Sequence, residues 1–250
     1  MSSRLPFVSA VATGRGDDGM TGLLFDDIRV QKDDLRTEAF GTVDEAVAAL
    51  GLARAELTSK EQHGALNPGL GQLRELVLRI QRELFVAGAE LATAPESRHK
   101  QVDGKTRVSR AMLEGIEQLL RDTEAAIELP REFVVPGETG VSAALELART
   151  IVRRAERRAV TLAYHDYAIR DGVMIPYLNR LADLLWILAR VAEQAESRAA
   201  TTSRVQGRPR PAAKSAKTAK TASTAAGAGN TGTDSAARVH PAQPESSNHE

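Results

Sequence analysis

Cysteine is absent from the 250 residues of this sequence. The absence excludes disulfide bonds, thiolate metal sites, iron–sulfur clusters and a cysteine nucleophile. It is compatible with a reducing compartment, and we expect a cytoplasmic protein. An excess of either charge is also absent, because 33 Lys and Arg residues balance 33 Asp and Glu residues. Such balance is not typical of a nucleic-acid binder or a membrane-surface protein.

Long apolar runs are missing as well. The N-terminal stretch MSSRLPFVSAVATG has one arginine and no long apolar core, which argues against a signal peptide. The most apolar later stretch, LADLLWILARVA, contains Asp183 and Arg190. It is too short and too charged to span a bilayer, so we expect no membrane segment.

The composition changes sharply near Arg198. Residues 201–250 contain no leucine, isoleucine or aromatic residue and cannot bury enough apolar surface to offset the entropy of ordering. We therefore divide the chain into a flexible N-terminus (1–12), a folded domain (13–197) and a disordered, low-complexity basic tail (198–250). The start of the tail could touch nucleic acid or acidic lipid, but such segments are more typically solvated, and we do not expect a nucleic-acid partner.

Helical periodicity dominates the folded domain, and no pair of strands is evident. The first helix is expected to begin at a capping box formed by Thr42 and Glu45. A second helix follows Pro68, and a third carries the apolar stripe from Val108 to Ile127. A fourth contains ARTIVRRAERRAV, and a fifth runs from about Val173 to Glu196. Long amphipathic helices with mostly short links predict an all-α fold, a five-helix antiparallel bundle.

The fourth helix is crowded with arginine. At about 100° per residue, one edge of its apolar face carries Arg149, Arg153, Glu156 and Arg157. Arg154 and Arg158 fall on the other side, as is typical of a solvated face. Like charges four residues apart repel by roughly 0.2–0.5 kcal/mol per pair, so the edge favours an anionic partner. A polyphosphate or carboxylate site and a structural network of ion pairs both fit this pattern.

A glycine-rich stretch, TGRGDDGMTG, spans residues 13–22. It lacks P-loop spacing, but closely spaced glycines let backbone N–H groups turn toward an anion. Arg15, Thr21 and Lys32 could add donors, and Asp17 or Asp18 could hold a hydrated Mg²⁺ beside phosphates. A flexible N-terminal turn is the simpler interpretation.

The fifth helix places polar residues among apolar ones. Asn179, Asp183, Trp186 and Arg190 share a face, and Arg180 can pair with Asp183 three residues later. An Asn one turn from an Asp could read a ribose or a base edge. A network of helix-surface hydrogen bonds fits equally well.

Six stretches, in order, resemble the PduO-type ATP:cob(I)alamin adenosyltransferases. They are TGRGDDGMTGLL, VQKDDLRTEAFGTVDEA, IQRELFVAGAELA, FVVPGETG, ARTIVRRAERRAV and YLNRLADLLWILAR, covering Thr13 to about Glu196. The resemblance implies a five-helix bundle and a homotrimer with active sites between subunits. It implies that Co(I) of cob(I)alamin attacks the 5′ carbon of ATP and expels triphosphate, with Mg²⁺ on the phosphates. A cobalamin-dependent mutase and a reductase are the expected partners.

The resemblance also implies roles for individual residues. The residues expected to contact ATP, either its phosphates with Mg²⁺ or another part of it, are Thr13, Gly14, Arg15, Gly16, Asp17, Thr21, Lys32, Arg153, Arg154, Glu156, Arg157 and Asn179. Arg149 would pair with Asp44 across the subunit interface, and Arg180 and Asp183 would support the site. Phe133 would lie against the corrinoid and exclude the lower axial ligand, which makes cobalt easier to reduce.

Several positions depart from the family pattern. Glu138 stands where a second glycine is usual, Glu146 where histidine is common, and Asp18 where lysine is frequent. Three other functions are compatible with parts of the sequence. The protein could be a carrier that retains the ATP site without rapid turnover. It could bind nucleic acid through its basic tail. It could also be a di-iron helical bundle, which needs paired E-x-x-H motifs. The one such motif, Glu96 to His99, lies in a polar loop and argues against the di-iron bundle.

Overall fold

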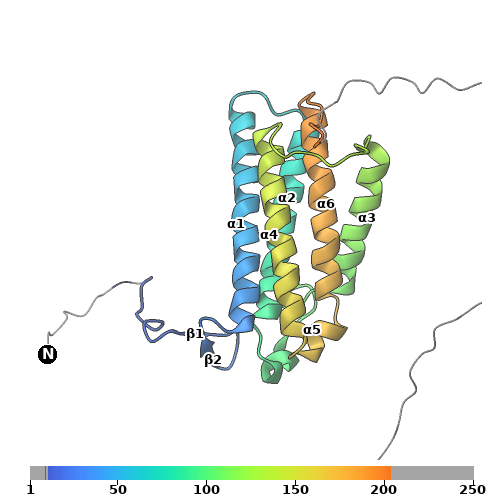
Figure 1. Cartoon of the computed structure of the whole chain (residues 1–250). Helices are drawn as coiled ribbons and strands as arrows, with labels where there is room; N and C mark the ends of the chain where they lie inside the picture. The colour runs from blue at the N-terminus through green and yellow to red at the C-terminus, as the bar shows by residue number, and fades with distance from the viewer. Residues whose placement is uncertain (1–8, 10, 204–250) are drawn as a thin grey trace, which may run out of the picture. The chain divides into compact units, whose positions relative to one another are not determined.

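The computed structural model describes residue 9 and residues 11–203. The elements follow in this order: β1 (Met20–Gly22), β2 (Arg29–Gln31), α1 (Leu35–Gln62), α2 (Pro68–Leu91), the 3₁₀ helix η1 (Pro95–Lys100), α3 (Arg110–Ala126), α4 (Gly140–Ala163), α5 (Tyr167–Asp171) and α6 (Met174–Ala195). The five long helices form a bundle, which confirms the predicted all-α class (Figure 1). None of the helices in this part of the chain combines the length and apolarity that a membrane crossing requires.

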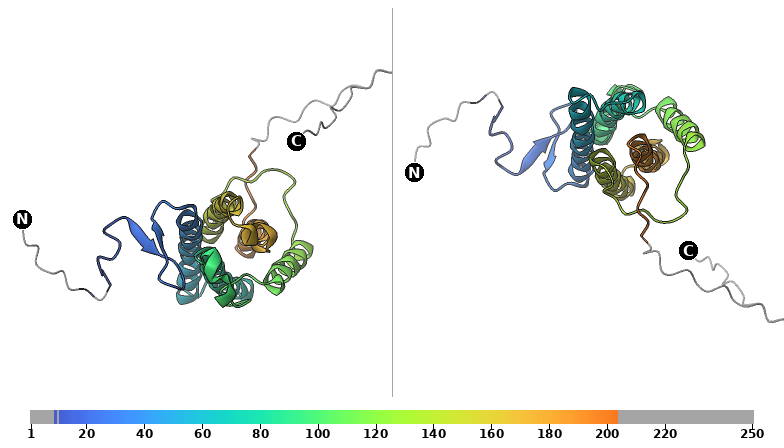
Figure 2. Two further views of the ribbon diagram at one scale, coloured as in Figure 1. Left: turned by 90° about the horizontal axis from the view of Figure 1, so that it is seen from below. Right: turned by 90° about the horizontal axis from the view of Figure 1, so that it is seen from above.

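The interior of the bundle is built around α6. This helix lies among α2, α3 and α4 (Figure 2), and 13 of its 22 residues are buried. Burying a large aliphatic side chain contributes roughly 1.5–3 kcal/mol, so α6 is the main apolar contributor to the fold. Two of its buried residues, Arg190 and Glu193, are charged and therefore need partners inside the bundle.

Side-chain caps determine where the helices begin. One residue before each of α1, α2, α3 and α4 accepts a hydrogen bond from a backbone N–H of the first turn: Asp34, Asn67, Ser109 and Thr139. Each such cap contributes about 1 kcal/mol. The predicted start of the first helix at Thr42 is wrong by about two turns, because Asp34 provides the cap. Thr42 instead donates its hydroxyl to the carbonyl of Glu38, at 2.7 Å.

A small hairpin precedes the bundle, and its existence contradicts the expectation that strands are absent. β1 and β2 pair antiparallel, with Met20 opposite Gln31 and Gly22 opposite Arg29. Strands of three residues are too short to show an alternating pattern in the sequence. The hairpin projects from the bundle beside the start of α1 (Figure 1).

The turn of the hairpin is anchored to the bundle. Phe25, Asp26 and Asp27 have φ values of 70°, 60° and 49°. Residues other than glycine adopt this left-handed region only at a cost, so the turn needs outside support. The carboxylate of Asp26 accepts hydrogen bonds from Ser97 and Lys100 of η1. The polar loop expected at 95–105 is thus partly helical and fixes the hairpin.

The described chain extends past the predicted domain boundary. Ser197 has a φ of 55° and reverses the chain after α6, while the N–H of Arg198 donates to the carbonyl of Glu193 at 2.8 Å. Residues 201–203 then form backbone hydrogen bonds with the loop before α4. Residues 198–203, which the sequence analysis assigned to the tail, therefore contact the folded domain. The remainder of the predicted tail, 204–250, lies outside the described residues, as do 1–8 and 10 of the N-terminus.

Candidate active site

The glycine-rich loop folds back onto the hairpin. The Nζ of Lys32 donates to the carbonyl of Gly16 at 2.7 Å, and Nη2 of Arg29 donates to the carbonyl of Arg15 at 2.7 Å. Gly14 and Gly19 have φ values of 70° and 81°, which glycine adopts without strain. Thr21 and the side chains of Arg15, Arg29 and Lys32 line a cavity of about 620 Å³. The predicted donors at Arg15, Thr21 and Lys32 therefore meet around one cavity.

Arg29 is a cavity residue that the sequence analysis missed. It forms an ion pair with Asp18 at 2.8 Å, and this hydrogen bond lowers the pKa of the Asp18 carboxyl. The pairing engages the Asp18 carboxylate. It leaves Asp17, in the loop, and Asp27, which lines the cavity, as nearby carboxylates. No local pattern signals the pair, because the two residues are 11 positions apart on either side of the hairpin turn.

The arginines of α4 divide according to their partners. The side chains of Arg154 and Arg158, expected on a solvated face, are largely exposed and pair with Glu45 and Glu38 of α1. Arg153 and Arg157 are exposed, and neither has a carboxylate partner among the described residues. A structural network of ion pairs thus accounts for the side of the helix that faces α1. It does not account for Arg153 and Arg157, which remain available to an external anion.

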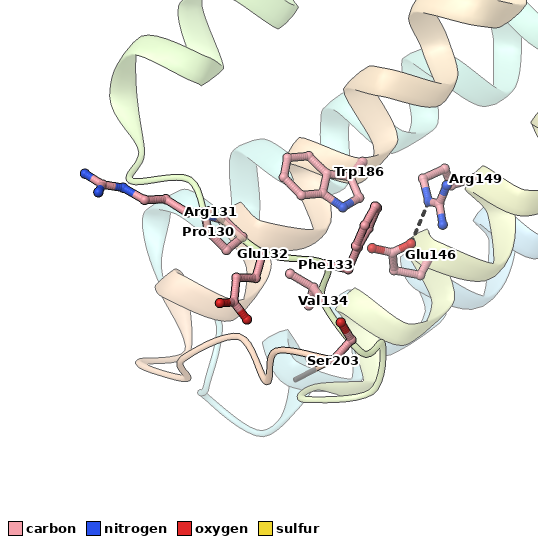
Figure 3. Close-up of a pocket in the computed structure, with 9 residues that line it drawn as sticks. All are labelled: Pro130, Arg131, Glu132, Phe133, Val134, Glu146, Arg149, Trp186 and Ser203. Carbon is pink, nitrogen blue, oxygen red and sulfur yellow. Dashed lines mark hydrogen bonds and ion pairs between the residues drawn. The ribbon is translucent and has the colours of Figure 1, made fainter. Parts of the chain in front are cut away.

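A cavity of about 580 Å³ lies beside Arg149 (Figure 3). Phe133, from the loop between α3 and α4, points between Trp186 of α6 and the pair formed by Arg149 and Glu146. The Phe133 side chain is 87% exposed, so packing within the chain does not bury it. Such an exposed aromatic ring at a cavity wall offers apolar surface to a large planar ligand.

A second cavity, of about 290 Å³, adjoins the first. Arg149 and Trp186 line both cavities, and the second is also lined by Arg153 of α4 and Asp183 of α6. Phe133 lines only the first of these two cavities, and Arg153 lines only the second. The wall that they share places Arg149 where it can influence ligands in both.

Arg149 is held by a buried charge network. Its Nε donates to the Glu146 carboxylate at 2.6 Å, and the other Glu146 oxygen lies 3.3 Å from Nη2 of Arg190. Arg190 and Glu193, 2.8 Å apart, are each 1% exposed. Two carboxylates balance two guanidinium groups, but Nε and Nη1 of Arg190 and Oε2 of Glu193 are buried without a hydrogen-bond partner among the described residues. Glu146, one of the departures from the family pattern, is thus the residue that links Arg149 to the interior.

Asn179 joins α6 to α4. Its amide nitrogen donates to Glu156 at 3.0 Å, and its amide oxygen accepts from Arg180 at 2.6 Å. Arg180 also lies 3.6 Å from Glu117 of α3. The expected pair of Arg180 with Asp183 is therefore wrong, because Asn179 and Glu117 engage the guanidinium instead. Asp183 lines the smaller cavity.

The predicted site residues do not all meet within one chain. The glycine-rich loop lies at the hairpin, beyond α1, whereas Arg149 and Arg153 line cavities among α3, α4 and α6 (Figure 2). Asp44, on α1, has no ion-pair partner among the described residues, and partial burial raises the pKa of its carboxyl. Asp44 is exposed, so its carboxylate is available to a positive partner from outside the chain.

Comparisons with known proteins identify the family of this chain. Residues 11–192 match the family model described as cobalamin adenosyltransferase. A corrinoid adenosyltransferase from Citrobacter freundii is 37% identical over 187 residues, which cover 73% of this chain and 94% of that protein. One from Bacillus subtilis is 40% identical over 179 residues, covering 72% of this chain and 84% of that protein.

Solved structures give the same result. A variant PduO-type ATP:corrinoid adenosyltransferase from Lactobacillus reuteri, complexed with cobalamin and ATP, matches with a TM-score of 0.65 and 27% identity, covering 78% of this chain and 99% of that chain. Another variant of that enzyme, complexed with ATP, matches with a TM-score of 0.63 and 26% identity over 78% and 100% of the two chains. Since the family model spans most of the folded domain and both sequence and fold agree, this chain belongs to the cobalamin adenosyltransferase family.

Proposed function

We propose that this protein transfers the 5′-deoxyadenosyl group of ATP to the Co(I) centre of a corrinoid. The electron pair on cobalt forms the Co–C bond, and the C5′–O bond of ATP breaks as triphosphate departs. Cobalt supplies the nucleophile, so the protein has to orient two substrates and stabilise a polyanionic leaving group. The observation that carries the proposal is the pair of adjoining cavities, one bounded by Phe133 and the other by Arg149 and Arg153.

The cations are proposed to bind the triphosphate of ATP. Arg153 has no acidic partner within the described chain, and its planar guanidinium can donate two parallel hydrogen bonds to phosphate oxygens. Arg15 and Lys32, with the backbone of Thr13, Gly14 and Gly16, would hold phosphates at the glycine-rich loop. The remaining expected ATP contacts are Asp17, Thr21, Arg154, Glu156, Arg157 and Asn179.

Mg²⁺ is proposed to arrive bound to the phosphates. The described part of the chain has no group of three or more His, Asp or Glu residues that could hold a metal ion. Asp18 is engaged by Arg29, so Asp17 in the loop, or Asp27 at the cavity wall, is left to contact a water of the hydrated ion. Such partial ligation is typical of Mg²⁺ at nucleotide sites.

The corrinoid is proposed to lie in the cavity of about 580 Å³ that Phe133 and Arg149 line. Phe133 would occupy the face of the macrocycle where a lower axial ligand would otherwise reach cobalt. An exposed phenyl ring offers no donor atom, so it excludes a polar ligand without replacing it. Trp186 supplies a second aromatic wall.

Assembly into a homotrimer is proposed to complete the site. The hairpin cavity and the α4 cavities face different sides of the chain, and Asp44 and Arg149 are the pair expected to meet between copies. A cytoplasmic location, a reductase that supplies electrons to cobalt and a cobalamin-dependent mutase that receives the product remain proposals that follow from the reaction alone.

The test is an anaerobic assay with purified protein, ATP·Mg²⁺ and chemically reduced cob(I)alamin. We expect adenosylcobalamin and triphosphate to form in equal amounts over many turnovers. Formation of one adenosylcobalamin per site without further turnover would identify a carrier instead. Release of ADP and phosphate without a Co–C bond would contradict both functions.

A further inference from the structure

The loop that carries Phe133 is tied to a segment beyond the family match. The match ends at residue 192, yet the N–H of Ser203 donates to the carbonyl of Phe133 at 2.7 Å. The N–H of Val135 donates to the carbonyl of Thr201 at 2.8 Å. These two bonds flank an antiparallel bridge between Val134 and Thr202. The end of the described chain therefore pairs with the loop as a short strand would.

Side chains reinforce the same contact. The hydroxyl of Thr201 donates to Glu138, and Arg198 lies 3.9 Å from the Glu138 carboxylate. The amide of Gln194 donates to the carbonyl of Glu128 at 2.9 Å. In the described part of the chain, every hydrogen bond or ion pair that joins residues 128–138 to another segment goes to residues 194–203.

The loop depends on this contact because it has little else to order it. It has no helix or extended strand of its own, and the side chain of Phe133 is 87% exposed. Fixing each residue of an irregular segment costs roughly 1–2 kcal/mol of conformational entropy, which packing of Phe133 does not offset. Ser203 and Phe133 line the same cavity (Figure 3), so the hydrogen bond between their backbones lies at the wall of that cavity.

We propose that residues 198–203 form a strap that positions Phe133 at the wall of the cavity of about 580 Å³. The strap acts through backbone groups, chiefly the N–H of Ser203 and the carbonyl of Thr201. The inference rests on the proposed function, which gives this cavity a corrinoid. There the strap keeps Phe133 on the face where a lower axial ligand would bind, and Ser203 is a positioning residue that need not touch the substrate.

The test compares Ser203→Pro with Ser203→Ala in the full chain. Proline removes the N–H that donates to Phe133, whereas alanine keeps it and removes only the hydroxyl. We expect Ser203→Pro to speed hydrogen exchange at the Val135 amide and to lower the four-coordinate fraction in the Co(II) spectrum of the ATP complex. Its kcat should fall roughly tenfold or more, since a displacement of about 1 Å can cost about 100-fold. Ser203→Ala keeps the backbone donor and should keep the wild-type exchange rate at the Val135 amide.

A second pair of variants repeats the test from the loop side. Val135→Pro removes the other backbone donor, Val135→Ala keeps it, and Phe133→Ala gives the spectrum expected when exclusion is lost. The strap is overturned if both proline variants retain the wild-type spectrum and kcat, or if the alanine controls lose as much as the proline variants. If the wild type forms no adenosylcobalamin, the proposed function fails. The Val135 exchange rate still decides whether the strap exists.

Discussion

Charge pairing separates the arginines of α4 into two groups. Arg154 and Arg158 are matched by acids of α1, and Arg149 is matched by Glu146. Arg153 and Arg157 have no acidic partner within residues 11–203, although they lie one turn apart and repel each other. Unmatched like charges at a cavity are costly without a ligand and favourable with a polyanion, so Arg153 should carry more of the function than Arg158.

Replacement of Arg153 by alanine tests this difference. We expect Arg153→Ala to lower kcat/KM by at least about 100-fold, because loss of one preorganised donor to a developing charge typically costs about 3–4 kcal/mol. Thermal stability should change little, since the side chain is exposed. Arg158→Ala, on the same helix but paired with Glu38, is the matched control and should keep near-normal turnover. Equal effects in the two variants would remove Arg153 from triphosphate binding.

Helical phase predicted which arginines share a face, and that division is retained in the structure. Phase could not predict that Glu45 would neutralise Arg154, because the two residues are 109 positions apart and meet only when α1 packs on α4. The pairing of Arg29 with Asp18 and of Glu146 with Arg190 was missed for the same reason. Ion-pair partners within one helix can be predicted from their spacing in the sequence. Partners on different elements can be identified only when the packing of those elements is known.

At the scale of elements, Glu90 joins the end of α2 to the start of α3. It is 3% exposed, and its carboxylate accepts a hydrogen bond from the N–H of Val108 at 2.7 Å. Burial raises the pKa of this carboxyl from 4.5 to about 7, although the Val108 bond and the nearby Arg98 and Arg107 oppose the shift. The carboxyl is therefore easier to bury in its protonated form.

The consequence is a stability that falls as the pH rises. In the unfolded chain Glu90 loses its proton near pH 4.5, whereas the folded protein holds that proton until about pH 7. Between these values the folded state binds more protons, so the free energy of unfolding decreases by roughly 3 kcal/mol in total and then levels off. The Glu90→Gln variant should lack this decrease in the free energy of unfolding when denaturation is measured at pH 5 and at pH 8. An identical slope in the variant would show that Glu90 is not the group responsible.

Element boundaries show where sequence patterns lose information. The apolar stripes predicted all five long helices, because each stripe extends over several turns. The hairpin was missed, since its strands are three residues long, and the first helix was started late, since Asp34 was not identified as its cap. Residues 198–203 were assigned to the tail because their order comes from pairing with a distant loop, and composition does not record such pairing.

At the scale of the whole molecule, the candidate site residues of one chain fall into two separate groups. Arg15 and Lys32 line the cavity at the hairpin, and Arg153 and Phe133 line the cavities beside α4. The hairpin lies on one side of α1, and α3 and α6 lie on the other (Figure 2). Asp44 is partly desolvated without a cation, and the Nε of Arg149 is engaged by Glu146 while its terminal nitrogens have no partner among the described residues. Asp44 of one copy and Arg149 of the next can therefore satisfy each other.

Mixed oligomers test this arrangement. Asp44→Ala and Arg149→Ala should each be nearly inactive alone, because every interface then lacks one member of the pair. In a ring formed from equal amounts of both variants, random assembly gives an intact interface at about one position in four, so co-expression should restore about a quarter of wild-type activity. As a control, either variant is mixed with a second inactive variant whose substitution lies on the same side of the interface. This mixture should restore no activity. If the pair formed within one chain, no mixture would recover activity, because each chain would carry its own defect into every site that it built.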